Sequence, residues 1–230
     1  MTEYVFEPHD RPSLPVYGSH LRFPVRRIFC VGRNYAEHAR EMGHDPDREP
    51  PFFFSKPADA LVESGACLPF PPATDDLHFE AELVVAIGKP GTRIAVEDAP
   101  GHIWGFAAGN DLTRRDLQAT AKSLSRPWDM AKGFDNSAVC GELCPIAQTG
   151  LLSDGPIRTK VDGKLRQDGN ISDMVWSIPE LISELSALVE LAPGDLIYTG
   201  TPAGVGSIRP GQSCTVEIAG LPKVSIRFIP

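Results

Sequence analysis

The sequence predicts an α+β fold that is mainly β and is built on one principal domain. Apolar runs with the alternation of strands recur along the chain, and the clearest of them covers residues 78–88. Helical patterns are few and short. A length of 230 residues with 42% hydrophobic residues is enough for one large core. We expect residues 1–24 to form an N-terminal arm, because prolines interrupt any periodicity there, and residues 25–230 to form a single domain.

Apolar runs and turn residues place the other elements in order. The expected strands cover residues 27–31, 52–54, 103–108 and 196–198. The expected helices cover residues 34–42 and 112–123, and a third begins at the capping box Ser177-Ile178-Pro179-Glu180. Asn34 is the expected N-cap of the first helix, and Gly43 is its expected C′ residue. The predicted apolar face of the third helix consists of Leu181, Ile182, Leu185, Leu188 and Val189.

The stretch 78–88 carries two carboxylates on one face. Its apolar face consists of Phe79, Ala81, Leu83, Val85 and Ile87, and its other face carries His78, Glu80 and Glu82. The two carboxylates lie about 6–7 Å apart along a strand, and they repel there by roughly 2–3 kcal/mol at an effective dielectric of about 20. These residues alone favour an ordinary solvated face, where the repulsion is weak. In a pocket, the pair would require a proton or a cation between the carboxylates.

Composition and charge exclude several classes of protein. A net charge of −8, with no cluster of lysine and arginine, argues against binding to nucleic acid. No apolar run reaches membrane-spanning length and the first residues lack a secretion signal, so we expect a cytoplasmic protein that does not bind membranes. The five cysteines are an odd number and are expected to be reduced thiols, with Cys140 and Cys144 in structural roles.

Three acidic residues suggest a metal site. Asp111 follows the apolar run at 103–108 and joins Glu80 and Glu82. Oxygen ligands suit a hard cation, Mg²⁺, Mn²⁺ or Ca²⁺. Three carboxylates would leave coordination positions for water and substrate, as in a catalytic site. Acidic residues on successive strands are common, so the spacing of the three is not diagnostic.

A second group of residues could supply acid–base chemistry. His38 and Glu41 are three residues apart on a predicted helix, so the carboxylate could orient the imidazole as a general base for water. Arg115, Gln118 and Lys132 are donors that could stabilise an oxyanion. A catalytic function depends on the convergence of these groups with the acidic residues, which spacing cannot establish.

Ordered motifs extend from about residue 27 to about residue 206. The first are Val31-Gly32-Arg33-Asn34-Tyr35, His38, Glu41 and Phe54-Ser55-Lys56-Pro57. The central ones are His78-Phe79-Glu80-Ala81-Glu82-Leu83, Asn110-Asp111-Leu112-Thr113, Arg115, Asp116, Gln118 and residues 128–132. The last are Leu196-Ile197-Tyr198-Thr199-Gly200-Thr201-Pro202 and Gly204-Val205-Gly206. In this order the motifs resemble the fumarylacetoacetate hydrolase family, and the resemblance favours a pocket over a solvated face at Glu80 and Glu82.

The resemblance implies a mixed β-roll or sandwich, commonly a homodimer, with Mg²⁺ or Mn²⁺ as cofactor, for which Ca²⁺ could substitute in a crystal. The implied metal ligands are Glu80, Glu82 and Asp111. The implied catalytic residues are His38, Glu41 and Lys132. The implied substrate-binding residues are Arg33, Tyr35, Lys56, Arg115, Gln118 and Thr201. For a substrate with a second carboxylate, the candidate anchors are Arg33, Arg40 and Lys56.

Within the family, the run at 51–60 is similar to fumarylpyruvate hydrolases. The resemblance therefore implies metal-dependent hydrolysis of a C–C bond in a 2,4-dioxo acid, with fumarylpyruvate as the expected small-molecule substrate and fumarate and pyruvate as products. Another acylpyruvase, an oxaloacetate decarboxylase and an isomerase of hydroxydienoic diacids remain alternatives, because they use related chemistry. A non-enzymatic protein with a structural cation is the alternative from another class, and it leaves His38, Glu41 and Lys132 without a role.

Overall fold

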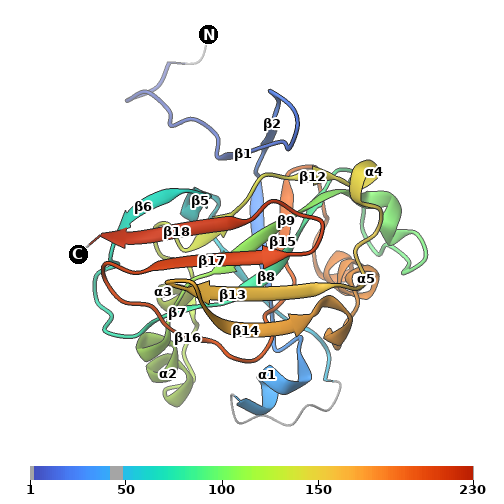
Figure 1. Ribbon diagram of the computed structural model, residues 1–230. Coiled ribbons are helices and arrows are strands. Elements are labelled where there is room, and N and C mark those ends of the chain that lie inside the picture. Colours follow the sequence, from blue (N-terminus) through green and yellow to red (C-terminus); the bar gives the residue numbers. More distant parts are fainter. Residues whose placement is uncertain (1–2, 42–48, 230) are drawn as a thin grey trace.

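Two curled β-sheets face each other in the structure, a computed structural model that describes residues 3–41 and 49–229 (Figure 1). The larger sheet has the strand order β4-β3-β15-β8-β9-β11-β5, and β12 pairs with β9. Its strands are β3 (Arg27–Gly32), β4 (Phe52–Lys56), β5 (Leu61–Glu63), β8 (Ala81–Ile87), β9 (Ile103–Asp111), β11 (Ala138–Cys140), β12 (Cys144–Pro145) and β15 (Asp195–Tyr198). The predicted α+β class with mainly β content is confirmed.

The second sheet has the order β14-β13-β17-β18-β6 and lies in front of the first in Figure 1. Its strands are β6 (Ala66–Pro69), β13 (Pro156–Val161), β14 (Lys164–Asn170), β17 (Ser213–Ile218) and β18 (Val224–Ile229). Smaller sheets are formed by β7 (Leu77–Phe79), β10 (Thr113–Arg114) and β16 (Gly206–Ser207), and by β1 (Ser13–Pro15) with β2 (Arg22–Pro24).

Five short helices complete the described chain. They are α1 (Ala36–Glu41), α2 (Arg115–Ser123), α3 (Asp129–Lys132), α4 (Ile146–Thr149) and α5 (Ile178–Leu188). Among the described residues, no helix has both the length and the apolar content needed to cross a membrane. The capping box of α5 is confirmed, because Ser177 N donates to Glu180 Oε2 at 2.9 Å.

The strand predicted at 78–88 is interrupted at Glu80 and is buried on both faces. Phe79, Leu83 and Val85 pack in the core between the two sheets, as the alternation predicts. Val84, on the opposite face of β8, packs in a second core cluster. The expectation of a solvated outer face from these residues alone is therefore wrong, because the larger sheet curls and encloses this second face.

One hydrogen bond across the larger sheet shows that the sheet is curled. Tyr198 on β15 donates its hydroxyl to the carbonyl of Val139 on β11 at 2.9 Å, although β8 and β9 lie between these strands. Three strand spacings amount to about 14 Å in a flat sheet, beyond the reach of a tyrosine side chain. The sheet therefore closes partly on itself, and the ends of its strands converge around the site described below.

Several predicted boundaries differ from the structure. Residues 13–24 form the β1–β2 hairpin, and Leu14 and Phe23 are buried, so the expected lack of regular structure is wrong for this part of the arm. The first helix begins at Ala36, because Asn34 uses its side chain to bond other segments and is not the N-cap. Gly43, its expected C′ residue, lies outside the described residues.

The predictions for two other helices also differ from the structure. The helix expected at residue 112 begins at Arg115, because Thr113–Arg114 pairs with β7 as a strand. On α5, Leu181, Ile182 and Leu185 are buried as predicted, whereas Leu188 is 70% exposed at the end of the helix.

The four strands β13, β14, β17 and β18 were not predicted. The cysteines are free thiols, as expected, and Cys140 and Cys144 are buried.

Candidate active site

Most of the residues proposed from the sequence line one pocket at the edge of the larger sheet. The pocket holds about 420 Å³ of space, including the part open to solvent. Its walls come from β3, α1, β4, the β7–β8 junction, α2, α3 and the loop after β15. The lining residues are Val31, Gly32, Arg33, His38, Phe54, Glu80, Glu82, Arg115, Gln118, Lys122, Trp128, Lys132 and Thr201.

Three carboxylates converge at the floor of the pocket: Glu80 and Glu82 line it, and Asp111 is buried beside them. Glu80 lies between β7 and β8, Glu82 lies on β8, and Asp111 ends the neighbouring antiparallel strand β9. All three are buried, and one oxygen from each lies within 4.8 Å of the others. The Asp111 backbone N–H donates to the Glu80 carbonyl at 2.9 Å and fixes the two chain segments side by side. Three convergent hard oxygens form a donor set that suits Mg²⁺ or Mn²⁺.

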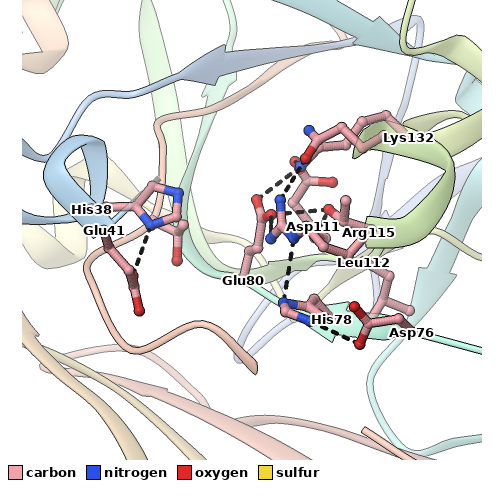
Figure 2. A network of polar contacts seen from close by, with 12 residues as sticks. His38, Glu41, Asp76, His78, Glu80, Asp111, Leu112, Arg115 and Lys132 are labelled. Carbon is pink, nitrogen blue, oxygen red and sulfur yellow. Dashed lines mark hydrogen bonds and ion pairs between the residues drawn. The ribbon is translucent and has the colours of Figure 1, made fainter. Parts of the chain in front are cut away.

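Two cations neutralise part of this acidic group (Figure 2). Lys132 Nζ lies 2.8 Å from Glu80 Oε2 and 2.7 Å from Asp111 Oδ2. Burial alone would lower the pKa of Lys132, but the carboxylates of Asp111 and Glu80 raise it above its ordinary value. Burial would likewise raise the pKa of Glu80, but Lys132 and Arg115 hold it well below its ordinary value. Glu80 and Lys132 are therefore both ionised.

Glu82 differs from the other two carboxylates because it forms no ion pair with any residue that the structure describes. Its Oε2 accepts a hydrogen bond from Gly200 N at 2.8 Å. Burial raises the pKa of Glu82 well above its ordinary value, and the charges of Asp111 and Glu80 add to the effect. A cation between the three carboxylates would remove this penalty, so the residues present fit a divalent ion.

His38 lines the pocket from α1, and Glu41, at the end of the same helix, lies beside it (Figure 2). His38 Nδ1 lies 3.3 Å from Glu41 Oε2, and His38 is 7% exposed. Glu41 also accepts from Gly204 N at 3.1 Å, which joins the helix to the glycine-rich loop. Burial lowers the pKa of His38 below 6.5, although Glu80 and the bond to Glu41 act in the opposite direction. His38 is therefore neutral near pH 7 and able to accept a proton.

Helix α2 directs further donors toward the floor. Arg115 forms an ion pair with Glu80, and its Nη1 donates to Gln118 Oε1 at 2.6 Å. The Gln118 amide nitrogen has no protein partner in the described parts of the chain and is free to donate to a ligand. Thr201 lines the pocket from the loop after β15, and its hydroxyl accepts from Gln167 Nε2 at 2.8 Å.

Three residues proposed as substrate contacts lie elsewhere. Lys56 is buried beneath the floor: its Nζ lies 2.7 Å from Asp111 Oδ1, and it donates to the carbonyls of Leu112 and Lys132. The predicted contact between Lys56 and substrate is therefore wrong, because this ammonium is fully engaged by the protein. Tyr35 is also buried and lines a neighbouring cavity, and Arg40 does not line the pocket.

Five lining residues were not among the site residues proposed from the sequence: Val31, Gly32, Phe54, Lys122 and Trp128. Phe54 and Trp128 form an aromatic wall, with their ring centroids 6.0 Å apart. Lys122 follows Arg115 and Gln118 at helical spacings of seven and four residues, so all three lie on one face of α2. This spacing could have predicted from the sequence that Lys122 faces the site with Arg115 and Gln118. The role of Trp128 had no such signal, because it depends on how α3 packs against β4.

The chain is similar to known proteins over most of its length. Residues 27–229 match the family model for the C-terminal domain of fumarylacetoacetate (FAA) hydrolase. A fumarylpyruvate hydrolase from Ralstonia sp is 42% identical over 191 residues, 82% of this chain and 99% of that relative. A mitochondrial oxaloacetate decarboxylase from Dictyostelium discoideum is 39% identical over 197 residues, 85% of this chain and 90% of that relative.

A solved structure extends the comparison to the whole fold. The crystal structure of fumarylpyruvate hydrolase from Pseudomonas aeruginosa in complex with Mn²⁺ and pyruvate is 49% identical to this chain. Its TM-score is 0.96, and the match covers 99% of both chains. The mixed β-roll or sandwich expected from the sequence is thus confirmed as the fold.

Proposed function

We propose, because the chain belongs to the fumarylacetoacetate hydrolase family, that it hydrolyses a C–C bond of a 2,4-dioxo acid and that fumarylpyruvate is its substrate. The observation that carries the proposal is one pocket lined by Glu80, Glu82 and His38. Asp111 completes the carboxylate triad at its floor, and Glu41 contacts His38 from behind. A purely structural cation site would not need this pair or the unengaged amide of Gln118.

Glu80, Glu82 and Asp111 are the proposed ligands of Mg²⁺ or Mn²⁺, and Ca²⁺ is a substitute that their oxygens would also accept. The bound ion would act as a Lewis acid toward the pyruvoyl oxygens of the substrate. Lys132 contacts two of these carboxylates, so its ammonium lies beside the reacting end of the substrate. Lys56 supports Asp111 from below and keeps that carboxylate in place.

His38 is the proposed general base. With Nδ1–H directed at Glu41, the other ring nitrogen is left as the proton acceptor. Burial keeps the ring neutral, and Glu41 stabilises the imidazolium that forms when His38 removes a proton from water. Glu41 is fixed in turn by Gly204 N, so the pair is positioned by two segments far apart in the sequence.

The proposed reaction is balanced by one water molecule. The water oxygen bonds to the fumaryl carbonyl carbon, and the carbonyl oxygen becomes an oxyanion that Lys132 and Gln118 are placed to stabilise. The C–C bond to the methylene carbon then breaks, and its electron pair remains on the pyruvate fragment as the enolate. A proton from His38 restores the methyl group of pyruvate, and fumarate is the second product.

The family also suggests a location, an oligomeric state and a division of the chain. We propose a cytoplasmic homodimer in which residues 25–230 are the catalytic domain and residues 1–24 an arm. The family match beginning at residue 27 supports this division. Size-exclusion chromatography with light scattering tests the dimer directly.

A substrate panel tests the proposed function. Purified protein with Mg²⁺ or Mn²⁺ is given fumarylpyruvate, maleylpyruvate, acetylpyruvate and oxaloacetate, and pyruvate release is followed by coupling to lactate dehydrogenase. We expect the highest kcat/KM for fumarylpyruvate. Oxaloacetate decarboxylation is the second candidate, because the Dictyostelium discoideum relative is 39% identical. A highest kcat/KM on oxaloacetate, with release of CO₂, would replace the proposed function with that activity.

A further inference from the structure

The pocket contains four cationic side chains, and two of them are already neutralised. Arg115 forms an ion pair with Glu80, and Lys132 forms ion pairs with Glu80 and Asp111. These two cations belong to the floor of the site. Because they lie at the floor and already contact carboxylates there, they are poorly placed to hold a carboxylate at the far end of the substrate.

The other two cations, Arg33 and Lys122, have no anionic partner in the described part of the chain. Arg33 makes no hydrogen bond or ion pair there. The Lys122 ammonium lies over the ring of Trp128, 5.1 Å from the ring centroid. Burial lowers the pKa of Lys122, and the nearby positive charges of Arg115 and Arg33 lower it further. Positive charges that repel one another beside a pocket favour an anionic ligand.

Arg33 and Lys122 lie nearer to solvent than the floor does. Glu80, Glu82 and Lys132 are buried, whereas Arg33 is exposed and Lys122 is half-buried. Arg33 also has a φ of +61°, a conformation that costs free energy for any residue except glycine. Such conformations persist where the surrounding structure fixes them, often beside binding sites. The aromatic wall that Phe54 contributes with Trp128 lines the same pocket.

We infer that Lys122, together with Arg33, binds the distal carboxylate of a dicarboxylate substrate and gives the enzyme its preference for diacid acylpyruvates. This inference rests on the proposed function and deepens it, because it assigns the end of fumarylpyruvate that does not react. The substrate would extend from the carboxylate triad along Phe54 and Trp128 to the two cations. Of the three anchors expected from the sequence, Arg33 is retained, and Lys122 replaces Lys56 and Arg40.

The test compares two substrates that differ at the distal end. Fumarylpyruvate has the second carboxylate and acetylpyruvate lacks it. The variants are Lys122→Met, which removes the charge, and Lys122→Arg, which keeps it. Arg33→Met tests the second cation. Arg126→Met is the matched control, because Arg126 is exposed and does not line the pocket.

We expect Lys122→Met to raise the KM for fumarylpyruvate roughly 10- to 100-fold, the scale of one lost charged hydrogen bond. Its kcat/KM for acetylpyruvate should change by less than about threefold. Lys122→Arg should restore much of the affinity, and Arg126→Met should match the wild type on both substrates. Equal losses on the two substrates, or no loss on fumarylpyruvate, would overturn the inference.

Calorimetry separates this inference from the proposed function. If the wild type with Mn²⁺ hydrolyses neither substrate, the proposed function fails, and binding then decides on Lys122 and Arg33. Weaker binding of fumarylpyruvate by Lys122→Met, with unchanged binding of acetylpyruvate, would still support the inference. Equal affinities of wild type and Lys122→Met for fumarylpyruvate, or no binding to either, would reject it.

Discussion

Gly200 donates its backbone N–H to Glu82 at 2.8 Å, so the loop after β15 holds a carboxylate of the triad in place. Gly200 has a φ of +97°, and a Cβ there would lie 2.8 Å from the Cβ of Asn34. Only glycine fits this approach. Asn34 itself donates to the carbonyl of Thr199 at 2.9 Å. The segment before α1 and the loop after β15 are thereby fixed together behind the pocket.

The clamp made by Asn34 should contribute strongly to stability. Its amide donates to the carbonyls of Thr199 and Trp176 and accepts from Trp176 N, and the residue is 1% exposed. We expect Asn34→Ala to lower the free energy of unfolding by about 2–4 kcal/mol, because one buried and two partly buried hydrogen bonds are lost. Urea denaturation measures this value. The control Gln148→Ala, at an exposed amide, should change it little, and equal effects of the two variants would contradict the clamp.

Glu82→Gln should separate folding from metal binding. The amide oxygen can keep the bond from Gly200, and the variant removes a buried carboxylate whose ionisation is disfavoured. We expect the metal-free variant to be as stable as the wild type or more so. Its affinity for Mn²⁺ should fall by at least about tenfold, so most of the rise in Tm on adding Mn²⁺ is lost. Thermal melts with and without the ion measure this rise.

The control for that experiment is Glu97→Gln, which alters an exposed carboxylate that does not line the pocket. It should keep the full rise in Tm with Mn²⁺. The same rise in Glu82→Gln as in the wild type would show that Glu82 is not a ligand.

The pair His38 and Glu41 should behave as one catalytic unit. His38→Ala and Glu41→Gln should each lower kcat by about 10²–10⁴-fold, the usual scale for loss of general-base catalysis. The double variant should lose little more than either single one, because removal of one partner already disables the other. Steady-state kinetics with fumarylpyruvate measures these losses, and calorimetry should show that Mn²⁺ still binds. Additive losses, or near-wild-type kcat in His38→Ala, would assign water activation to another group.

The acid limb of the pH–rate profile should lie below pH 6.5. Burial lowers the pKa of His38 from 6.5, so the ring remains neutral and basic at a lower pH than a solvated histidine. The lowered pKa of His38 also makes the free energy of unfolding depend on pH. This free energy should fall as the pH drops through 6.5, because the unfolded chain binds the proton more readily than the native protein. The measured quantity is kcat/KM against pH with a saturating divalent ion.

Glu41→Gln provides the matched test of this assignment. Glu41 raises the pKa of His38 through its hydrogen bond and its charge, so its removal should move the acid limb to still lower pH. A limb centred at or above pH 6.5 in the wild type, or an upward shift in Glu41→Gln, would exclude His38 as the group observed.

The sequence predicted the structure correctly where one short pattern determines which side chains are buried. The alternation from Phe79 to Ile87 predicted which side chains enter the main core. It could not reveal that the opposite face is also buried, because this depends on the curl of a sheet whose strands are far apart in sequence. Lys56 was misplaced for the same reason: only the three-dimensional fold brings Lys56, on β4, to Asp111 at the end of β9, although three strands lie between β4 and β9 in the sheet.

The missed second sheet had clearer signals. Strands β13 and β14 flank the turn at Asp162 and Gly163, and an Asp-Gly pair between alternating runs is a strong hairpin signal. The run Val224–Ile229 alternates between buried and more exposed residues along β18. The position of Asn34 had no local signal, because its bonds reach residues more than 140 positions away.

Product analysis shows whether the protein hydrolyses fumarylpyruvate with a divalent ion. Fumarylpyruvate is incubated with the protein and Mn²⁺, and the products are quantified by proton NMR. We expect equimolar fumarate and pyruvate, loss of turnover after dialysis against excess EDTA, and its return when Mn²⁺ is restored. Unchanged fumarylpyruvate, an isomer formed without cleavage, or full turnover in excess EDTA would contradict the proposed function.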